Sequence, residues 1–218
     1  MSPCCKNDCD VDALQGKQRS TLIKVLWINA VMFISVAIAA FYGKSTALLS
    51  DSLDNLGDAL TYGLSLFAVS KGQATKAKVA LFKGGLIFVA AIVVVAQIIY
   101  RLISPVLPSY EVMSIFSLAG LLANGLCLFL LWHHRREDIN MSSVFECSRN
   151  DIATNLSVIV AAIGVWVFNS GLPDIIIATL LAVLLLKSSA HVIKGALSEL
   201  SQSNKTLNQI GENEEPPS

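Results

Sequence analysis

Six long apolar stretches constrain this chain more than any other feature. They cover approximately residues 22–42, 47–69, 79–103, 112–132, 143–168 and 173–193. An apolar helix of about 20 residues crosses the hydrocarbon core of a bilayer, where the backbone must satisfy its own hydrogen bonds. Hydrophobic residues make up 54% of the 218 residues and charged residues 15%, which is more apolar than a soluble domain requires. The sequence therefore predicts an all-α integral membrane protein with six transmembrane helices.

The distribution of basic residues predicts the orientation of these helices. If the N-terminus is cytoplasmic, most lysines and arginines fall on or near the inner side, and only Lys44 and Arg101 fall near the outer side. Cytoplasmic segments of membrane proteins carry such an excess of positive charge. We therefore expect both termini in the cytoplasm. The first apolar run is too long for a signal peptide, and the polar segment 1–21 precedes it, so no cleavage is expected.

Three regions follow from this pattern. We expect a cytoplasmic N-terminal tail over 1–21, a six-helix transmembrane domain over 22–198, and a disordered polar tail over 199–218. The N-terminal tail contains Cys4, Cys5 and Cys9. These thiols could capture a metal ion and pass it to the membrane domain, or they could be incidental, because adjacent cysteines in a flexible tail have no fixed site geometry.

The second apolar stretch contains an acidic segment, DSLDNLGDAL, at 51–60. An aspartate near the centre of a membrane helix costs about 2.5 to 3.5 kcal/mol, so several together require partners, water or a bound cation. At about 100° per residue, four oxygen-bearing side chains fall on one stripe of a helix. They are Asp51, Asp54, Asn55 and Asp58. This stripe is therefore expected to face the protein interior.

The fifth stretch carries a similar set of residues. Cys147 and Asp151 are four residues apart and share a helix face, Asn155 follows one turn later, and Asn150 flanks them. Together with Asp51 and Asn55, they would supply the four donors of a tetrahedral site. Mixed oxygen and sulfur donors suit Zn²⁺, Cd²⁺, Co²⁺ or Fe²⁺ better than Mg²⁺ or Ca²⁺.

Two points about this site stay open at the sequence level. The acids could instead pair with Arg149 and lysines as structural ion pairs, or be solvated near a membrane face. Hydropathy also places Asp51 nearer the outer end of its span and Cys147 nearer the inner end of the other, so the two pairs face each other only if a helix tilts or extends.

Three segments resemble the cation diffusion facilitator family of six-helix metal efflux transporters. They are ALLSDSLDNLGDALTYGLSL, SRNDIATNLSVIVAAIGVW and PDIIIATLLAVLLLKSSAHVI, and the resemblance covers 22–198. In that family the second span carries an acidic residue or histidine followed four residues later by aspartate, and the fifth carries histidine followed four later by aspartate. The corresponding positions here are Asp51, Asn55, Cys147 and Asp151. Asn55 thus replaces the usual aspartate, with Asp54 as a second choice of ligand, and Cys147 replaces the usual histidine.

The resemblance implies a secondary transporter that exports a divalent transition metal from the cytoplasm, by proton antiport, with Zn²⁺ as the favoured ion. It implies no enzymatic activity and no prosthetic group. The expected partners are the metal ion, protons, the lipid bilayer and a second copy of the chain, without nucleic acid, and the expected location is a bacterial inner membrane. Family members commonly have a cytoplasmic C-terminal domain that aids dimerisation, which we expect to be absent here.

Two other classes of function are compatible with a metal site in a membrane domain. A membrane-embedded sensor or assembly subunit would bind a cation without moving it. An intramembrane hydrolase would need an open coordination position and an activated water, which four protein ligands disfavour.

Overall fold

The computed structural model describes residues 4–68, 73–132 and 139–213, which form six α-helices. They are α1 (Cys4–Gly43), α2 (Thr46–Ala68), α3 (Gln73–Ile103), α4 (Tyr110–Trp132), α5 (Ile139–Phe168) and α6 (Leu172–Asn213). No β-strand occurs in these ranges. The all-α fold expected from the sequence is therefore present.

Five of the six helices contain segments that are long and apolar enough to cross a membrane. These segments are Arg19–Gly43, Ala77–Ile103, Tyr110–Trp132, Ser148–Phe168 and Leu172–Ser198. The remaining helix, α2, does not meet the same standard, and it carries Asp51, Asp54 and Asp58 within its 23 residues. Of the two helices expected to carry the site, α5 is thus a candidate span by length and composition and α2 is not.

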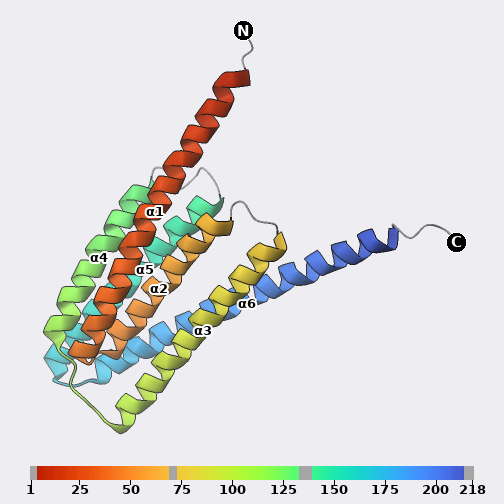
Figure 1. The fold of residues 1–218 in the computed structure, drawn as a ribbon. Helices are drawn as coiled ribbons and strands as arrows, with labels where there is room; N and C mark the ends of the chain where they lie inside the picture. Colours follow the sequence, from red (N-terminus) through yellow and green to blue (C-terminus); the bar gives the residue numbers. More distant parts are fainter. Residues whose placement is uncertain (1–3, 69–72, 133–138, 214–218) are drawn as a thin grey trace.

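The helices form two groups (Figure 1). In one group, α1, α2, α4 and α5 run side by side, with α1 packed mainly on α2 and α4 mainly on α5. In the other, α3 packs along α6 more extensively than any other helix pair packs. Because α2 contacts both α3 and α6, and α5 contacts α6, the boundary between the groups runs along α2 and α5.

A tight turn joins α1 to α2 at the end of the bundle that we call the short-turn end, where α5 also turns into α6. Only Lys44 and Ser45 separate α1 from α2, and Lys44 adopts the left-handed conformation with a φ of 53°. The Ser45 Oγ accepts a hydrogen bond from the backbone N–H of Leu48 at 3.0 Å. Ser45 is therefore the N-cap residue of α2, a role in which serine is strongly preferred.

A carboxylate from α6 accepts hydrogen bonds from the first residues of α2. Asp174 accepts hydrogen bonds from the Ser45 hydroxyl at 2.6 Å and from the backbone N–H groups of Thr46 at 2.8 Å and Ala47 at 3.2 Å. Its side chain is only 2% exposed. The first N–H groups of a helix lack partners within the helix and favour a negative charge. We refer to this arrangement as the Asp174 cap, and it fixes the start of α2 to the start of α6.

Apolar side chains separate into an interior and a surface set. The interior cluster includes Val36 of α1, Leu48 of α2, Val94 of α3, Met113 of α4 and Val158 of α5, all fully buried. Large apolar side chains remain exposed on the outside, as a lipid-facing surface requires. Examples are Phe41, Phe88, Phe129, Trp166 and Ile176.

The two segments expected as tails are helical over most of their length. The segment 4–21 is continuous with α1, and the segment 199–213 is continuous with α6, so both expected tails are helical over these residues. Both terminal helices also run beyond the apolar segments Arg19–Gly43 and Leu172–Ser198. The side chains of Cys4, Cys5 and Cys9, which the sequence suggested as metal-capturing groups, lie outside the described residues.

Candidate functional site

Two matching pairs of polar residues occupy the interior faces of α2 and α5. Asp51 and Asn55 on α2 are 1% and 2% exposed, and Asp151 and Asn155 on α5 are 5% and 0% exposed. In each pair the asparagine Nδ2 donates to the backbone carbonyl of the aspartate four residues earlier, at 2.9 Å on α2 and 2.8 Å on α5. This local bond is available to a polar side chain inside a helix, and it fixes the direction of the amide.

The oxygen atoms of these pairs are not fully satisfied. Asp51 Oδ2, Asn55 Oδ1, Asp151 Oδ2 and Asn155 Oδ1 are buried without a hydrogen-bond partner among the described residues. Most buried polar groups are paired, and an unpaired one costs about 1 to 3 kcal/mol. Because these atoms are hydrogen-bond acceptors, they suit a cation or ordered water as a partner.

A glycine on α4 makes room for one of these amides. A Cβ atom at Gly120 would collide with the Asn155 Oδ1, whereas a Cβ at Gly125, five residues later on the same helix, would meet no atom within 4 Å. Gly120 therefore allows α4 and α5 to approach closely at the level of Asn155. Small residues serve this purpose between membrane helices.

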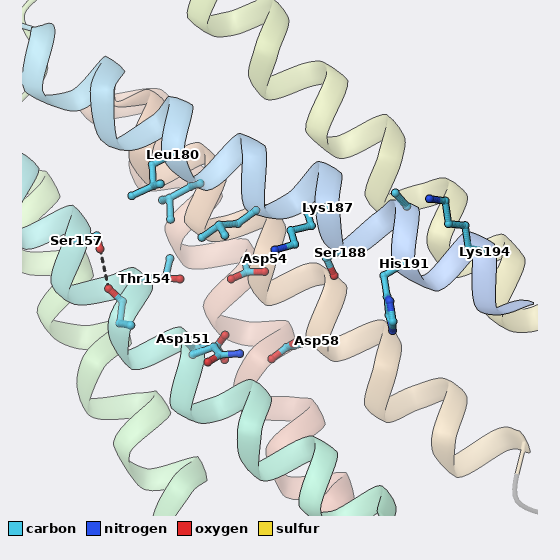
Figure 2. Close-up of a pocket in the computed structure, with 15 residues that line it drawn as sticks. Asp54, Asp58, Asp151, Thr154, Ser157, Leu180, Lys187, Ser188, His191 and Lys194 are labelled. Atoms are coloured by element: carbon cyan, nitrogen blue, oxygen red, sulfur yellow. Dashed lines mark hydrogen bonds between the residues drawn. The ribbon is translucent and has the colours of Figure 1, made fainter.

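A cavity of about 780 Å³ lies between α2, α5 and α6 (Figure 2). Its walls are formed by Asp54, Asp58, Asn150, Asp151, Ala153, Thr154, Ser157, Leu180, Leu181, Leu184, Lys187, Ser188, Ala190, His191 and Lys194. Asp54 and Asp58 enter from α2 and Asp151 from α5, while Lys187 and His191 enter from α6. The cavity therefore has an acidic wall on α2 and α5 and a basic stripe on α6.

The structure shows which part of α2 lies beside Asp151 of α5. Asp151 lines the cavity together with Asp54 and Asp58, whereas Asp51 is buried outside that lining. Asp58 accepts a hydrogen bond from the Tyr62 hydroxyl at 3.0 Å. Asp151 therefore lies closer to the Asp54–Asp58 part of α2 than to Asp51. The mismatch in level that the sequence suggested concerns Asp51 and Cys147, and the Cys147 side chain lies outside the described residues.

Asp54 and Asn55 occupy different environments although they are adjacent. Asp54 lines the main cavity and also a small pocket of about 20 Å³ that it shares with Ser50, Thr154, Leu181, Leu184 and Leu185. Asn55, like Asp51, is buried outside the lining of both spaces. Asp54 is therefore the residue of the two that a solute in the cavity meets first.

The structure brings together only part of the expected ligand set. Asp51 and Asn55 lie together on α2, and Asp151 lies across from that helix, but the side chain of Cys147 lies outside the described residues. Among the described His, Cys, Asp and Glu side chains, no group of three or more could hold a metal ion. A transported cation would therefore need helix movement, Cys147, backbone or amide oxygens, or water to complete its coordination.

Three residues were not assigned a role from the sequence, two of them in the cavity and one at the short-turn end. Sequence reasoning placed Asp58 on the acidic stripe without assigning it to the site, and it did not single out Lys187 or Asp174. The signal for Lys187 was a single lysine within the apolar run LLAVLLLK, with His191 and Lys194 following at helical spacing. The signal for Asp174 was an acid in the first turn of a span.

Comparison with known proteins agrees with this architecture. Residues 22–201 match the family described as the cation efflux transmembrane domain. The chain is 25% identical over 203 residues to the zinc transporter ZitB of Yersinia pestis, covering 85% of this chain and 64% of that protein. It is 24% identical over 201 residues to a cadmium, cobalt and zinc/H(+)-K(+) antiporter of Bacillus subtilis, covering 86% and 64%.

A third relative is the cation efflux system protein CzcD of an Alcaligenes species, 27% identical over 199 residues, with 85% of this chain and 62% of that protein covered. The chain thus spans less than two thirds of the length of these relatives. Their shared domain is a transport domain rather than an enzyme, and the exposed apolar helices fit a multi-pass membrane protein. The family match over most of its length shows that the chain belongs to the cation efflux family, the cation diffusion facilitators.

Proposed function

We propose that this chain is a secondary transporter that moves a divalent transition-metal cation out of the cytoplasm in exchange for protons. Zn²⁺ is the favoured cargo, with Cd²⁺, Co²⁺ and Fe²⁺ as further candidates, because the relatives carry zinc, cadmium and cobalt in their names. The observation that carries the proposal is the set of buried, unpaired oxygens on α2 and α5 beside a large acidic cavity.

The proposed binding residues are Asp51, Asn55, Cys147 and Asp151, with Asp54 as the alternative to Asn55. The cavity lining supports a two-stage path, since a cation entering the cavity meets Asp54, Asp58 and Asp151 before it reaches the buried Asp51 and Asn55. In this path Asp151 serves both stages, because it borders the cavity and also carries an unpaired buried oxygen.

Two carboxyl groups on one cavity wall support proton exchange. Asp58 and Asp151 line the same cavity, and because two ionised carboxylates would repel each other there, one shared proton is favoured when no cation is bound. A divalent cation arriving between them would take the place of that proton. Release of the cation on the other side would allow a proton to return, and this cycle couples the two fluxes.

The proposed topology has six membrane crossings with both termini in the cytoplasm. The support for α2 as a crossing is its burial among α1, α3, α5 and α6, which shields its aspartates from lipid. The short-turn end then faces outward. We further propose that the chain acts as a homodimer in a bacterial inner membrane. Reporter fusions at the two ends of the chain test the orientation, and crosslinking in intact membranes tests the dimer.

Transport by purified protein in liposomes provides the direct test. A panel of Zn²⁺, Cd²⁺, Co²⁺ and Fe²⁺ is applied while metal uptake and internal pH are recorded together. Metal-dependent proton movement is expected for the wild type. A variant with both Asp51→Ala and Asp151→Ala is expected to lose both signals, and transport equal to the wild type would overturn the site assignment.

The same assay separates the alternative class of function. A sensor or assembly subunit would bind a metal ion in calorimetry but produce no flux in liposomes. The choice between Asp54 and Asn55 is tested by comparing Asp54→Asn with Asn55→Ala. Loss of metal affinity in only one of the two variants identifies the ligand, and equal loss in both assigns a role to each.

A further inference from the structure

The basic stripe on α6 is a feature that the proposed function does not use. Lys187, His191 and Lys194 follow at intervals of four and three residues and line the same cavity as Asp54, Asp58 and Asp151. All three lie within the candidate span Leu172–Ser198. Charged residues in membrane spans are costly and usually pair with one another or line a water-filled space.

Lys187 is the member of the stripe whose side chain points toward Asp54 on the acidic wall (Figure 2). Leu184, one turn earlier on α6, shares the small pocket of about 20 Å³ with Asp54, so α6 and α2 approach each other closely there. Lys187 follows on the same face, and its side chain points to the part of the cavity that contains Asp54 (Figure 2). A lysine ammonium on its flexible four-carbon stem can move over such a space.

Lys187 and the carboxylates are separated in this conformation. Among the described side chains, no salt bridge joins Lys187 or Asp54 to an oppositely charged group. The cavity thus holds opposite charges on facing walls, and the walls belong to different helix groups, with α2 and α5 in one group and α6 in the other. Movement of the α3–α6 pair against the other four helices would change the distance between them.

We propose that Lys187 is a tethered counter-cation for the transport site. This inference rests on the proposed transport function. When the cargo has left, the ammonium of Lys187 moves to Asp54 and stabilises the empty site, and an incoming divalent cation must displace it. The lysine thereby weakens cargo binding and favours the return of the cargo-free protein. Such a residue sets affinity and selectivity without being a ligand.

Removal of this charge gives an expected pattern that a structural role would not produce. Lys187→Met should bind Zn²⁺ about tenfold more tightly, because one unit of positive charge leaves a partly hydrated cavity. Net uptake into liposomes should fall severalfold, while exchange of labelled Zn²⁺ for unlabelled Zn²⁺ should persist, since exchange does not need the cargo-free return. Lys187→Arg keeps the charge and should retain net uptake.

Lys24→Met is the matched control, because it removes the same charge from an exposed position on α1 that does not line the cavity. It should leave affinity and uptake unchanged. Unchanged or weaker Zn²⁺ binding by Lys187→Met, or equal effects of the two variants, would overturn the proposal.

A metal-free measurement separates failure of this inference from failure of the transport function. Lys187→Met should lower the thermal midpoint of the full chain in detergent, because the Asp54 carboxylate then lacks its counter-charge. Adding Asp54→Asn removes that unbalanced charge and should restore part of the loss. If the wild type neither binds nor moves metal, the proposed transport function is wrong, but the double-mutant cycle still tests whether Lys187 pairs with Asp54. Additive effects of the two substitutions on the thermal midpoint would refute that pairing.

Discussion

Two buried carboxylates, Asp174 at the short-turn end and Asp151 in the middle of the bundle, have opposite surroundings. Asp174 accepts hydrogen bonds from a hydroxyl and two backbone N–H groups. Asp151 shares a cavity wall with Asp54 and Asp58, and its Oδ2 is buried without a hydrogen-bond partner among the described residues. A carboxylate surrounded by donors stabilises the fold, whereas one left with unpaired oxygen favours a bound cation at the expense of stability. The donors around an intramembrane acid therefore indicate its role better than its burial does.

The largest effect is expected from Asp151→Asn. Losing one charged partner of a bound cation costs about 3 kcal/mol, or roughly 100-fold in affinity, so metal uptake into liposomes should nearly vanish. The thermal midpoint without metal should stay the same or rise, because the variant relieves the crowding of carboxyl groups. A large drop in the midpoint would show that Asp151 is a structural residue like Asp174.

Asp174→Ala should have the next largest effect, and on stability. It leaves the N–H groups of Thr46 and Ala47 without their acceptor, and removing such charge-assisted bonds costs about 3 kcal/mol. Thermal unfolding in detergent should show a clearly lowered midpoint, while the protein that remains folded should bind Zn²⁺ with wild-type affinity. A selective loss of Zn²⁺ affinity with an unchanged midpoint would reverse the comparison.

Gly120→Ala tests how tightly the middle region is built. Its Cβ would collide with the Asn155 Oδ1, and overpacking of this kind costs about 2 kcal/mol. We expect a lower thermal midpoint together with weaker Zn²⁺ binding, since the amide must move. Gly125→Ala is the control on the same helix, where a methyl group meets open space. Equal behaviour of the two variants would show that α4 does not hold Asn155 in place.

The smallest effect is expected from Ser45→Ala. This substitution removes the N-cap hydroxyl but leaves Asp174 on the two backbone N–H groups, so the cost should be about 1 kcal/mol. The midpoint should therefore fall by clearly less than in Asp174→Ala. If the two variants were equally destabilised, the capping serine rather than the α6 carboxylate would dominate the Asp174 cap.

The sequence predicts the individual helices well, but it does not predict how far neighbouring helices are shifted along one another. The apolar stretches predicted five of the candidate membrane spans to within about five residues at each end, because length and composition control partitioning into lipid. Helical spacing also predicted that Asp51, Asn55 and Asp151 face inward, and all three are buried. Membrane crossing by α2 and the full set of metal ligands stay predictions.

Spacing along one helix carries no information on how far a neighbouring helix is shifted. For this reason the shared place of Asp151 and Asp58 in one cavity lining was not predicted. The same limit applies to Asp174, whose partners at Ser45 and Ala47 are more than 120 positions away in the chain. Long-range hydrogen bonds of this kind depend on the packing of whole helices, which one sequence pattern does not reveal.

The two-residue connection between α1 and α2 has a consequence for biogenesis. With three aspartates, α2 partitions poorly into lipid by itself, whereas α1 is apolar over Arg19–Gly43. Because only Lys44 and Ser45 separate them, the two helices would enter the bilayer together as a hairpin, with α1 compensating the insertion cost of α2. The acidic helix α2 would then enter the membrane before α5 and α6 are synthesised, and α1 would be the first helix to pack against it and separate it from lipid.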